Sequence, residues 1–233
     1  MCGAVRAPPR NGRASVVDTV PVLTPEGFAA ATDVSRETLA RLEAYAVLLT
    51  QWQAAINLVG GDTLTDPWRR HMLDSAQLVP FLPAGAGAIT DLGSGAGFPG
   101  LVVAIMTGRP VHLVESTGKK AAFLREAIRL TGAPATVHRG RIEHQDPWPG
   151  GVVTARALAP LTVLLDYAAP FLEAAGNGAV CLFLKGARAG EELTEASKSW
   201  RMTAERFQSA TDPTGVILRI GDIARDGPPG KRR

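Results

Sequence analysis

The chain has 233 residues, of which 45% are hydrophobic and 20% are charged, and its formal net charge is +3. These values are ordinary for a globular protein. The two cysteines, Cys2 and Cys181, lie far apart and give neither a disulfide framework nor a zinc cluster. The sequence contains no apolar run long enough to span a membrane and no apolar core of a secretory signal. We therefore expect a cytoplasmic enzyme without a metal site or a membrane partner.

The basic excess lies at the two ends of the chain. Residues 1–15 carry three arginines and no acid, while residues 225–233 carry four basic residues and one acid, so the body between them is net acidic. Both ends are rich in Gly and Pro, a composition that predicts disorder. We assign no catalytic part to either end.

Helical patterns follow the N-terminal arm. Apolar residues recur every three or four positions from Ser35 to about Leu58, which predicts a helix capped by Ser35. A second helix is expected to begin at Asp66-Pro67, a cap followed by a first-turn proline, and to run toward Leu78.

The second helix carries His71 and Asp74, which are three positions apart and so can meet on one face. No further ligand stands at a spacing suited to a metal, and Ser75 lacks the context of a hydrolase nucleophile. The pair is equally consistent with a surface ion pair and with a functional site.

The ten residues from Asp91 to Gly100 contain an acid and four glycines, placed between a strand-like segment and the helix-like run 101–106. Glycine allows backbone angles that other residues avoid and lets a ligand approach the main chain. The free N–H groups of a helix start favour negative or polar ligand groups. The segment therefore predicts a site for a nucleotide-like cofactor, with a purely structural turn as the alternative.

Two cofactor patterns overlap in this loop. Gly95-x-Gly97-x-x-Gly100 matches the dinucleotide fingerprint, and Asp91-x-Gly93-x-Gly95-x-Gly97 matches the first motif of S-adenosylmethionine methyltransferases. A carboxylate at position 91 would repel a pyrophosphate and attract the cationic amino group of adenosylmethionine, which favours the second pattern. Glu115 ends the next strand-like run, where an acid commonly binds ribose hydroxyls in either class.

Strand-like and helix-like segments alternate from residue 88 onward, which implies a parallel sheet with helices on both faces. The expected strands are 88–92, 111–115, 135–139, 152–155, 180–184 and 216–220, with helices such as 119–130 and 161–172 between them. Residues 203–209 are expected to pair with the last strand as a hairpin, an arrangement typical of methyltransferase sheets. We predict an α/β, Rossmann-like class I methyltransferase fold: a mostly parallel sheet with a terminal antiparallel strand, plus N-terminal helices.

The carboxyl ends of parallel strands form the ligand site in such sheets. Basic residues follow several of the expected strands: Lys119, Lys120, Arg139, Arg141, Arg156 and Lys185. Cations at this edge suit an anionic substrate such as RNA, whose phosphates are bound mainly by Lys and Arg. We expect Arg156 and Lys185 in particular to serve the site.

Taken in order, several short segments resemble the small-subunit ribosomal RNA methyltransferase G family, also called glucose-inhibited division protein B. They are Asn57-Leu58, His71 to Ser75, Asp91 to Gly100, Glu115-Ser116, Lys119-Lys120, Phe123-Leu124, Arg141 to Glu143, Arg156-Ala157, Pro160-Leu161 and Lys185-Gly186. The match covers roughly residues 40–190. Val59 stands where many members carry a threonine, so any role of that hydroxyl is lost or replaced.

The resemblance implies methylation of N7 of one guanine in the decoding-region loop of 16S rRNA, with S-adenosylmethionine as the cofactor. The implied partner is 16S rRNA or a precursor of the small ribosomal subunit, and we expect a monomer. N7 of guanine is an unprotonated acceptor, so the reaction needs no general base. A nicotinamide-dependent oxidoreductase remains an alternative, although no Tyr-x-x-x-Lys pattern occurs. A non-catalytic RNA-binding factor is the other alternative.

The motifs together give a set of expected site residues. The resemblance implies cofactor contacts by Gly93, Phe98, Ile142, Glu143 and Arg156, and the loop and strand-end patterns add Asp91, Ser94, Gly95, Gly97 and Glu115. The expected substrate contacts are Asn57, His71, Asp74, Lys119, Lys120 and Lys185, and Arg156 and Lys185 are the expected catalytic residues. The expected divisions of the chain are a flexible arm (1–34), a helical segment (35–84), a methyltransferase domain (85–222) and a basic tail (223–233).

Overall fold

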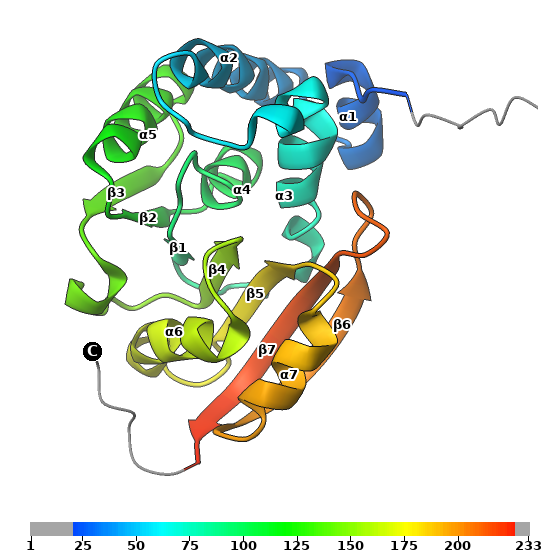
Figure 1. Ribbon diagram of the computed structural model, residues 1–233. Coiled ribbons are helices and arrows are strands. Elements are labelled where there is room, and N and C mark those ends of the chain that lie inside the picture. The colour runs from blue at the N-terminus through cyan, green and yellow to red at the C-terminus, as the bar shows by residue number, and fades with distance from the viewer. Residues whose placement is uncertain (1–20, 227–233) are drawn as a thin grey trace, which may run out of the picture.

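A computed structural model describes residues 21–226 and contains one seven-stranded sheet with the order β3-β2-β1-β4-β5-β7-β6. Figure 1 shows this sheet between two groups of helices. The strands are β1 (Ile89–Leu92), β2 (Val111–Glu115), β3 (Ala135–Arg139), β4 (Val152–Arg156), β5 (Val180–Lys185), β6 (Trp200–Gln208) and β7 (Val216–Arg225). The α-helices are α1 (Pro25–Thr32), α2 (Arg36–Gln53), α3 (Asp74–Ala76), α4 (Gly100–Thr107), α5 (Gly118–Thr131), α6 (Leu161–Ala175) and α7 (Ala189–Ala196).

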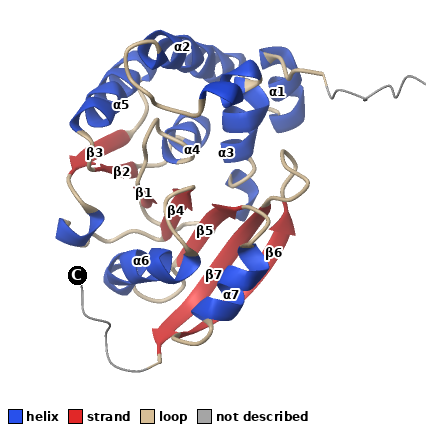
Figure 2. Cartoon of the chain, viewed as in Figure 1, coloured by secondary structure: helices blue, strands red, loops and turns tan. Residues whose placement is uncertain are grey.

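Strands β1 to β5 are parallel to one another, while β7 is antiparallel to both β5 and β6. The predicted mostly parallel sheet with a terminal antiparallel hairpin is therefore confirmed (Figure 2). Asp91 of β1 stands opposite Leu113 of β2 and Thr154 of β4. This register brings the carboxyl ends of β1, β2, β4 and β5 to one edge, where a ligand site is expected in such sheets.

Each face of the sheet has its own buried cluster of apolar side chains. Ile89, Leu113 and Leu182 belong to the cluster that α2, α4 and α5 cover, whereas Val114 and Phe183 belong to the cluster under α6. Alternate residues of a strand point to opposite faces, so short apolar strands can serve two cores at once.

The N-terminal arm was predicted wrongly between residues 25 and 32. These residues form α1, whose first turn is capped by the Thr24 side chain, which accepts a hydrogen bond from the Gly27 N–H at 3.1 Å. Phe28 of α1 is fully buried, and its ring lies 5.3 Å from that of Trp68. A single aromatic anchor therefore holds a helix that the composition of the arm concealed. The expected disorder of residues 1–20 lies outside the described residues.

Other boundaries also differ from those expected. Helix α2 ends at Gln53. The Gln53 side chain binds the backbone of Leu58 and Val59, which holds the chain that leaves the helix close to its last turn. The expected basic tail begins later than residue 223, since β7 continues to Arg225. Three short 3-10 turns, η1 (Gly61–Thr65), η3 (Val79–Phe81) and η4 (Ile142–His144), were not foreseen.

The second expected helix is present but is not a regular α-helix. It begins as a π-helical stretch, η2 (Trp68–Leu73), in which the Asp74 N–H donates to the carbonyl of Arg69 five residues earlier, and it continues as α3. Such stretches are rare and often occur at functional sites. Within residues 21–226, no helix has the length and apolar character needed to cross a membrane.

Phe28→Ala should lower the free energy of unfolding by about 3–5 kcal/mol, the usual cost of emptying a buried aromatic site. Val22→Ala is the control, because Val22 is 60% exposed and should change stability by less than about 0.5 kcal/mol. Urea denaturation followed by circular dichroism measures both. Equal stabilities of the two variants would mean that α1 does not pack as described.

Candidate active site

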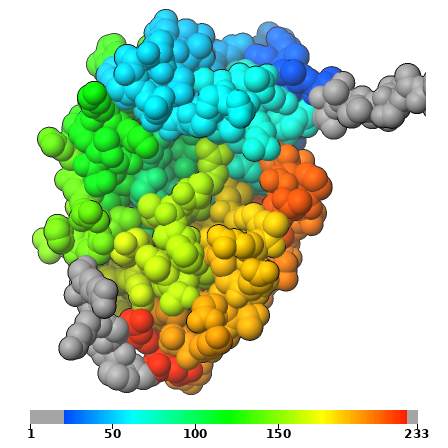
Figure 3. Space-filling view, viewed as in Figure 1, coloured from blue at the N-terminus to red at the C-terminus, as the bar shows by residue number. Residues whose placement is uncertain are grey.

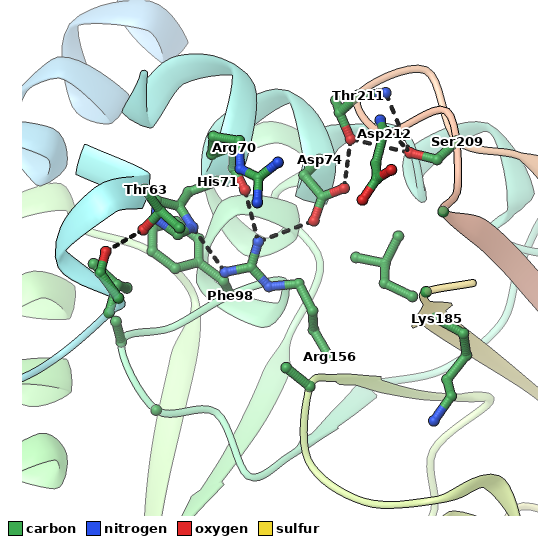
Figure 4. A pocket seen from close by; sticks show the side chains of 18 of the residues that line it. Thr63, Arg70, His71, Asp74, Phe98, Arg156, Lys185, Ser209, Thr211 and Asp212 are labelled. Atoms are coloured by element: carbon green, nitrogen blue, oxygen red, sulfur yellow. Dashed lines mark hydrogen bonds and ion pairs between the residues drawn. The ribbon is translucent and has the colours of Figure 1, made fainter. Parts of the chain in front are cut away.

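A cavity of about 760 Å³ opens at the carboxyl edge of the sheet. Its walls are the glycine loop after β1, the π-helical stretch η2, the segment after β5 and the turn between β6 and β7 (residues 209–215). The space-filling view places the orange turn against the cyan helices, although some 130 residues separate them in sequence (Figure 3). Figure 4 shows the polar side chains of the cavity.

The glycine loop has the shape that the sequence predicted. Gly93 and Gly97 have φ angles of 64° and 96°, and a Cβ atom at these positions would lie 2.5 Å from Leu158 and 2.8 Å from the Tyr45 hydroxyl. Tyr45 is fully buried and donates its hydroxyl hydrogen to the carbonyl of Ala96. The N-terminal helices thus support the loop from below.

Glu115 lies at the end of β2 and is tied to the loop. Its two carboxylate oxygens accept the N–H of Gly95 at 2.8 Å and the N–H of Thr117 at 2.6 Å. A carboxylate oxygen has two lone pairs, so each keeps one for a further donor. A Cβ on Gly95 would meet only the Gly93 carbonyl oxygen, at 3.8 Å, so this glycine leaves open space beside Glu115.

Asp91 differs from the expectation. It is fully buried and does not line the cavity; its carboxyl group packs against Gly100 and accepts the Thr154 hydroxyl at 2.7 Å. Burial raises the pKa of Asp91 to about 6, against the opposing effect of hydrogen bonds from Thr154 and Ser94. One of its oxygens has no partner among the described residues. Asp91 therefore supports the loop from beneath. It does not face the cavity, although the charge argument required it to do so.

Arg156, at the end of β4, is held by three groups of the second helix. It donates to the Asp74 carboxylate at 2.9 Å, to the Arg70 carbonyl at 3.0 Å and to Nδ1 of His71 at 2.9 Å. The guanidinium carbon also lies 5.0 Å from the centre of the Phe98 ring, within cation–π range. Three of its five N–H donors are thereby used, and two remain. His71 and Asp74 are thus partners of Arg156 rather than a surface ion pair.

The hydrogen bonds determine which nitrogen of His71 carries the proton. Arginine can only donate, so Nδ1 must accept and Nε2 must bear the hydrogen. Nε2 then donates to the Thr63 hydroxyl at 2.8 Å, and that hydroxyl donates to the Gly60 carbonyl at 2.6 Å. The imidazole also stacks on Phe98 with ring centres 4.7 Å apart. Burial, followed by the charges of Arg156 and Arg70, lowers the pKa of His71 to about 3, so it stays neutral near pH 7.

Lys185 lines the cavity, but its ammonium group is engaged elsewhere. It pairs with Glu192 of α7 at 2.6 Å and donates to the Ala159 carbonyl at 2.9 Å. Glu192 also accepts the Leu161 N–H at the start of α6. This network holds the loop after β4, so the structure favours a positioning part for Lys185 over the expected direct substrate contact.

The other expected residues divide into two groups. Gly93, Ser94, Gly95, Phe98 and Lys120 line the cavity, as expected of a site. Outside that lining are Asn57 and Lys119, which are exposed, and Gly97 and Glu115, which are buried. Ile142 and Glu143 line a separate groove beside α6, where the Tyr167 hydroxyl donates to Glu143 at 3.1 Å.

Sequence reasoning missed several residues of the cavity. Arg70 and Arg188 line it, and like Lys120 they form no ion pair within the described part of the chain. Thr63 and the turn residues Ser209, Thr211 and Asp212 were also missed. Ser209 and Thr211 give no local signal, because they bind Gln77 and Asp74 of a distant segment.

Comparison with known proteins gives a consistent result. The family model described as rRNA small subunit methyltransferase G matches residues 38–214. The chain is 57% identical over 203 residues to ribosomal RNA small subunit methyltransferase G of Rhodospirillum rubrum, covering 87% of this chain and 100% of that protein. The same-named protein of Parvibaculum lavamentivorans is 50% identical and is matched over 95% of this chain and 97% of its own length.

Solved structures support the fold. A glycopeptide N-methyltransferase, MtfA, complexed with S-adenosyl-L-methionine aligns with a TM-score of 0.53 at 11% identity, covering 64% of this chain and 93% of that one. An O-methyltransferase from Bacillus cereus in complex with SAH aligns with a TM-score of 0.50 at 14% identity, covering 85% of this chain and 100% of that one. At these identities the likeness concerns the fold alone, which is that of class I methyltransferases.

His71 should remain neutral, with its proton on Nε2, from pH 8 down to pH 5. Its pKa is lowered in the folded state, so folding favours the neutral form and the resulting stability is lost as pH falls below the ordinary value near 6.5. Long-range ¹H–¹⁵N NMR spectra of the imidazole nitrogens identify the tautomer directly. A proton on Nδ1, or a titration of His71 above pH 5, would contradict the described contact with Arg156.

Proposed function

The chain belongs to the rRNA small subunit methyltransferase G family, and we propose that it methylates N7 of one guanine in the decoding-region loop of 16S rRNA. It is an S-adenosylmethionine-dependent rRNA methyltransferase, which removes both alternatives, the nicotinamide-dependent oxidoreductase and the non-catalytic RNA-binding factor. We further propose that the substrate is 16S rRNA or a precursor of the small subunit, bound by a monomer.

The residues at the sheet edge fit the cofactor. Glu115 keeps a lone pair on each oxygen for the ribose hydroxyls, and Gly95 leaves the space beside it open. Gly93, Ser94 and Phe98 contribute the adjoining wall. We keep Ile142 and Glu143 as further cofactor contacts on the strength of the resemblance, since they follow β3, the neighbour of β2. When bound, the cofactor supplies an electrophilic methyl group on a sulfonium.

The observation that carries the proposal is a well-held arginine beside a histidine that cannot act as a base. The one histidine that lines the cavity, His71, has its acceptor nitrogen occupied by Arg156. Attack by N7 needs no base, because its lone pair forms the new N–C bond while the C–S electron pair leaves with sulfur. Guanine then carries the positive charge that the sulfonium had.

Arg156 is proposed to position the base. Its position is fixed by Asp74, His71 and Phe98, while two of its N–H donors remain for guanine O6 or a neighbouring phosphate. Accurate placement of N7 against the methyl group supplies much of the rate, and an error of 1 Å can cost about 100-fold.

The unpaired cations of the cavity are proposed to bind RNA phosphates. Arg70 lies in η2, Lys120 in α5 and Arg188 directly before α7, so the three cations come from separate parts of the opening. A phosphate contact depends on charge and is weakened by salt, whereas a contact to a base edge is not. Lys185 acts through the loop after β4 that it holds.

Arg156→Lys should reduce kcat/KM for RNA methylation on the order of 100-fold, because lysine keeps the charge but cannot bridge Asp74 and His71. Arg69→Lys is the matched control, since Arg69 lies on the same stretch but pairs with Asp66 outside the cavity. Transfer of a labelled methyl group from adenosylmethionine to 16S rRNA measures both. Equal activity of the two variants would remove Arg156 from the proposed role.

The modified atom is tested separately in cells. Mass-spectrometric mapping of small-subunit rRNA from cells that lack this protein should show the loss of one 7-methylguanosine. Restoring the gene should return that nucleoside at the same position. An unchanged 7-methylguanosine content would refute the proposed target.

A further inference from the structure

The turn between β6 and β7 forms one wall of the cavity and is anchored firmly to the second helix. Gln77 accepts the Ala210 N–H at 3.0 Å and donates to the Ser209 hydroxyl at 3.2 Å. Asp74 accepts the Thr211 hydroxyl at 2.7 Å through the oxygen that does not bind Arg156. The turn is therefore held at a fixed position relative to Arg156, although it lies near the other end of the chain.

Asp212 is the acid that this turn presents. One carboxylate oxygen, Oδ1, accepts both the N–H and the hydroxyl of Thr214 at 2.8 Å, which orients the group. The second oxygen, Oδ2, has no hydrogen-bond donor or cation bonded to it among residues 21–226. Figure 4 shows the carboxyl group pointing from the turn toward the cavity. The hydrogen bonds from Thr214, together with the charge of Arg70, lower the pKa of Asp212, so it is ionised near pH 7.

Asp212 differs in this respect from the other acids of the cavity. Asp74 is paired with Arg156 and Glu192 with Lys185, so their charges are compensated. A carboxylate without an ion-pair partner repels the phosphates of an approaching RNA. Its presence costs affinity unless the bound substrate brings donors to it.

We propose that Asp212 recognises the target base through its free oxygen Oδ2, whose two lone pairs accept N1–H and N2–H of the Watson–Crick edge of guanine, since Oδ1 already accepts two donors from Thr214. This inference rests on the proposed function, because it takes the base in the cavity to be the methyl acceptor. N7 lies on the five-membered ring, and the Watson–Crick edge is on the other side of the purine. Figure 4 places Phe98 of the cofactor loop and Asp212 on opposite sides of Arg156. A base with N7 toward the loop thus turns its Watson–Crick edge toward the turn.

The chemistry of this edge distinguishes guanine from adenine. Guanine offers two adjacent donors, N1–H and N2–H, to the carboxylate. Adenine offers an acceptor, N1, beside a donor, so the free oxygen Oδ2 would face a lone pair. Proteins read splayed-out bases of single-stranded RNA through this edge. A site built to accept hydrogen bonds rejects a base that lacks the donors, because the bound base covers the acceptor and leaves it unpaired.

Asp212→Asn tests the proposal with little change in shape. Asparagine retains the oxygen that binds Thr214 but presents an N–H₂ group where the second oxygen was, so donors would face donors. We expect the kcat/KM for an RNA fragment that carries the target guanine to fall roughly 10- to 100-fold, the usual range for the loss of a specific base contact. Binding of adenosylmethionine and the melting temperature should stay unchanged.

Replacing the target guanine by inosine supplies the decisive comparison. Inosine keeps N7 and N1–H and lacks only the N2 amino group. The wild-type protein should prefer guanine to inosine several-fold in both Kd and kcat/KM, and Asp212→Asn should lose that preference. Asp222→Asn is the control, because Asp222 lies on the same hairpin, is exposed and does not line the cavity.

The outcomes separate the two proposals. If Asp212→Asn keeps the wild-type ratio of guanine to inosine, Asp212 does not read the base. If the wild-type protein forms no 7-methylguanosine, the proposed function fails, while the ratio of the two Kd values still judges Asp212. A loss of preference in the Asp222 variant as well would also overturn the assignment, since the effect would then not belong to the cavity.

Discussion

The site depends on one interaction, in which Arg156 binds the side chains of both Asp74 and His71. It joins the carboxyl end of β4 to the N-terminal helical layer, two parts of the molecule that share no local sequence signal. Asp74 neutralises the guanidinium with one oxygen and anchors the β6–β7 turn with the other. Because one carboxylate serves both, the arginine and the turn cannot move independently. The Asp74 carboxylate thus fixes the positions of two walls of the cavity. A substrate that contacts both walls is held at a defined depth in the cavity.

The π-helical stretch explains how His71 and Asp74 reach Arg156 together. The Arg70 carbonyl also accepts from the guanidinium, so Arg70 and His71 of the stretch and Asp74, which directly follows it, all bind one group. A neutral His71 is essential to this arrangement, since a protonated imidazole beside Arg156 would replace an acceptor by a second positive charge. Burial enforces neutrality at the same time as it strengthens the hydrogen bonds, because both effects come from the exclusion of water.

The sequence predicted those features that depend on local pattern. Strands β2 and β3 were located to the residue, since alternating short apolar runs between Gly and Pro leave few other conformations. The glycine loop was recognised because its backbone angles require those residues. Features that depend on distant partners were not recognisable. Helix α1 packs through Phe28 on Trp68, and Lys185 binds Glu192 of a helix that was not predicted. The turn at Asp212 contacts a helix more than 130 residues earlier in the chain. Asp91 was placed correctly in the loop, but its direction was misjudged, since charge alone does not say which side of a strand end a carboxyl group takes.

The cations around the cavity fall into two groups, those with an ion-pair partner and those without one, and the two groups have different roles. Arg156 and Lys185 are compensated by Asp74 and Glu192, so they contribute directed hydrogen bonds and fixed geometry with little net field. Arg70, Lys120 and Arg188 stand at the opening without such partners in the described part of the chain and supply the field that attracts phosphates. The net acidity of the folded body is therefore no obstacle to RNA binding, because attraction depends on the local arrangement of charge rather than on its sum. It follows that salt should weaken capture of the RNA far more than it disturbs the geometry of the base once bound.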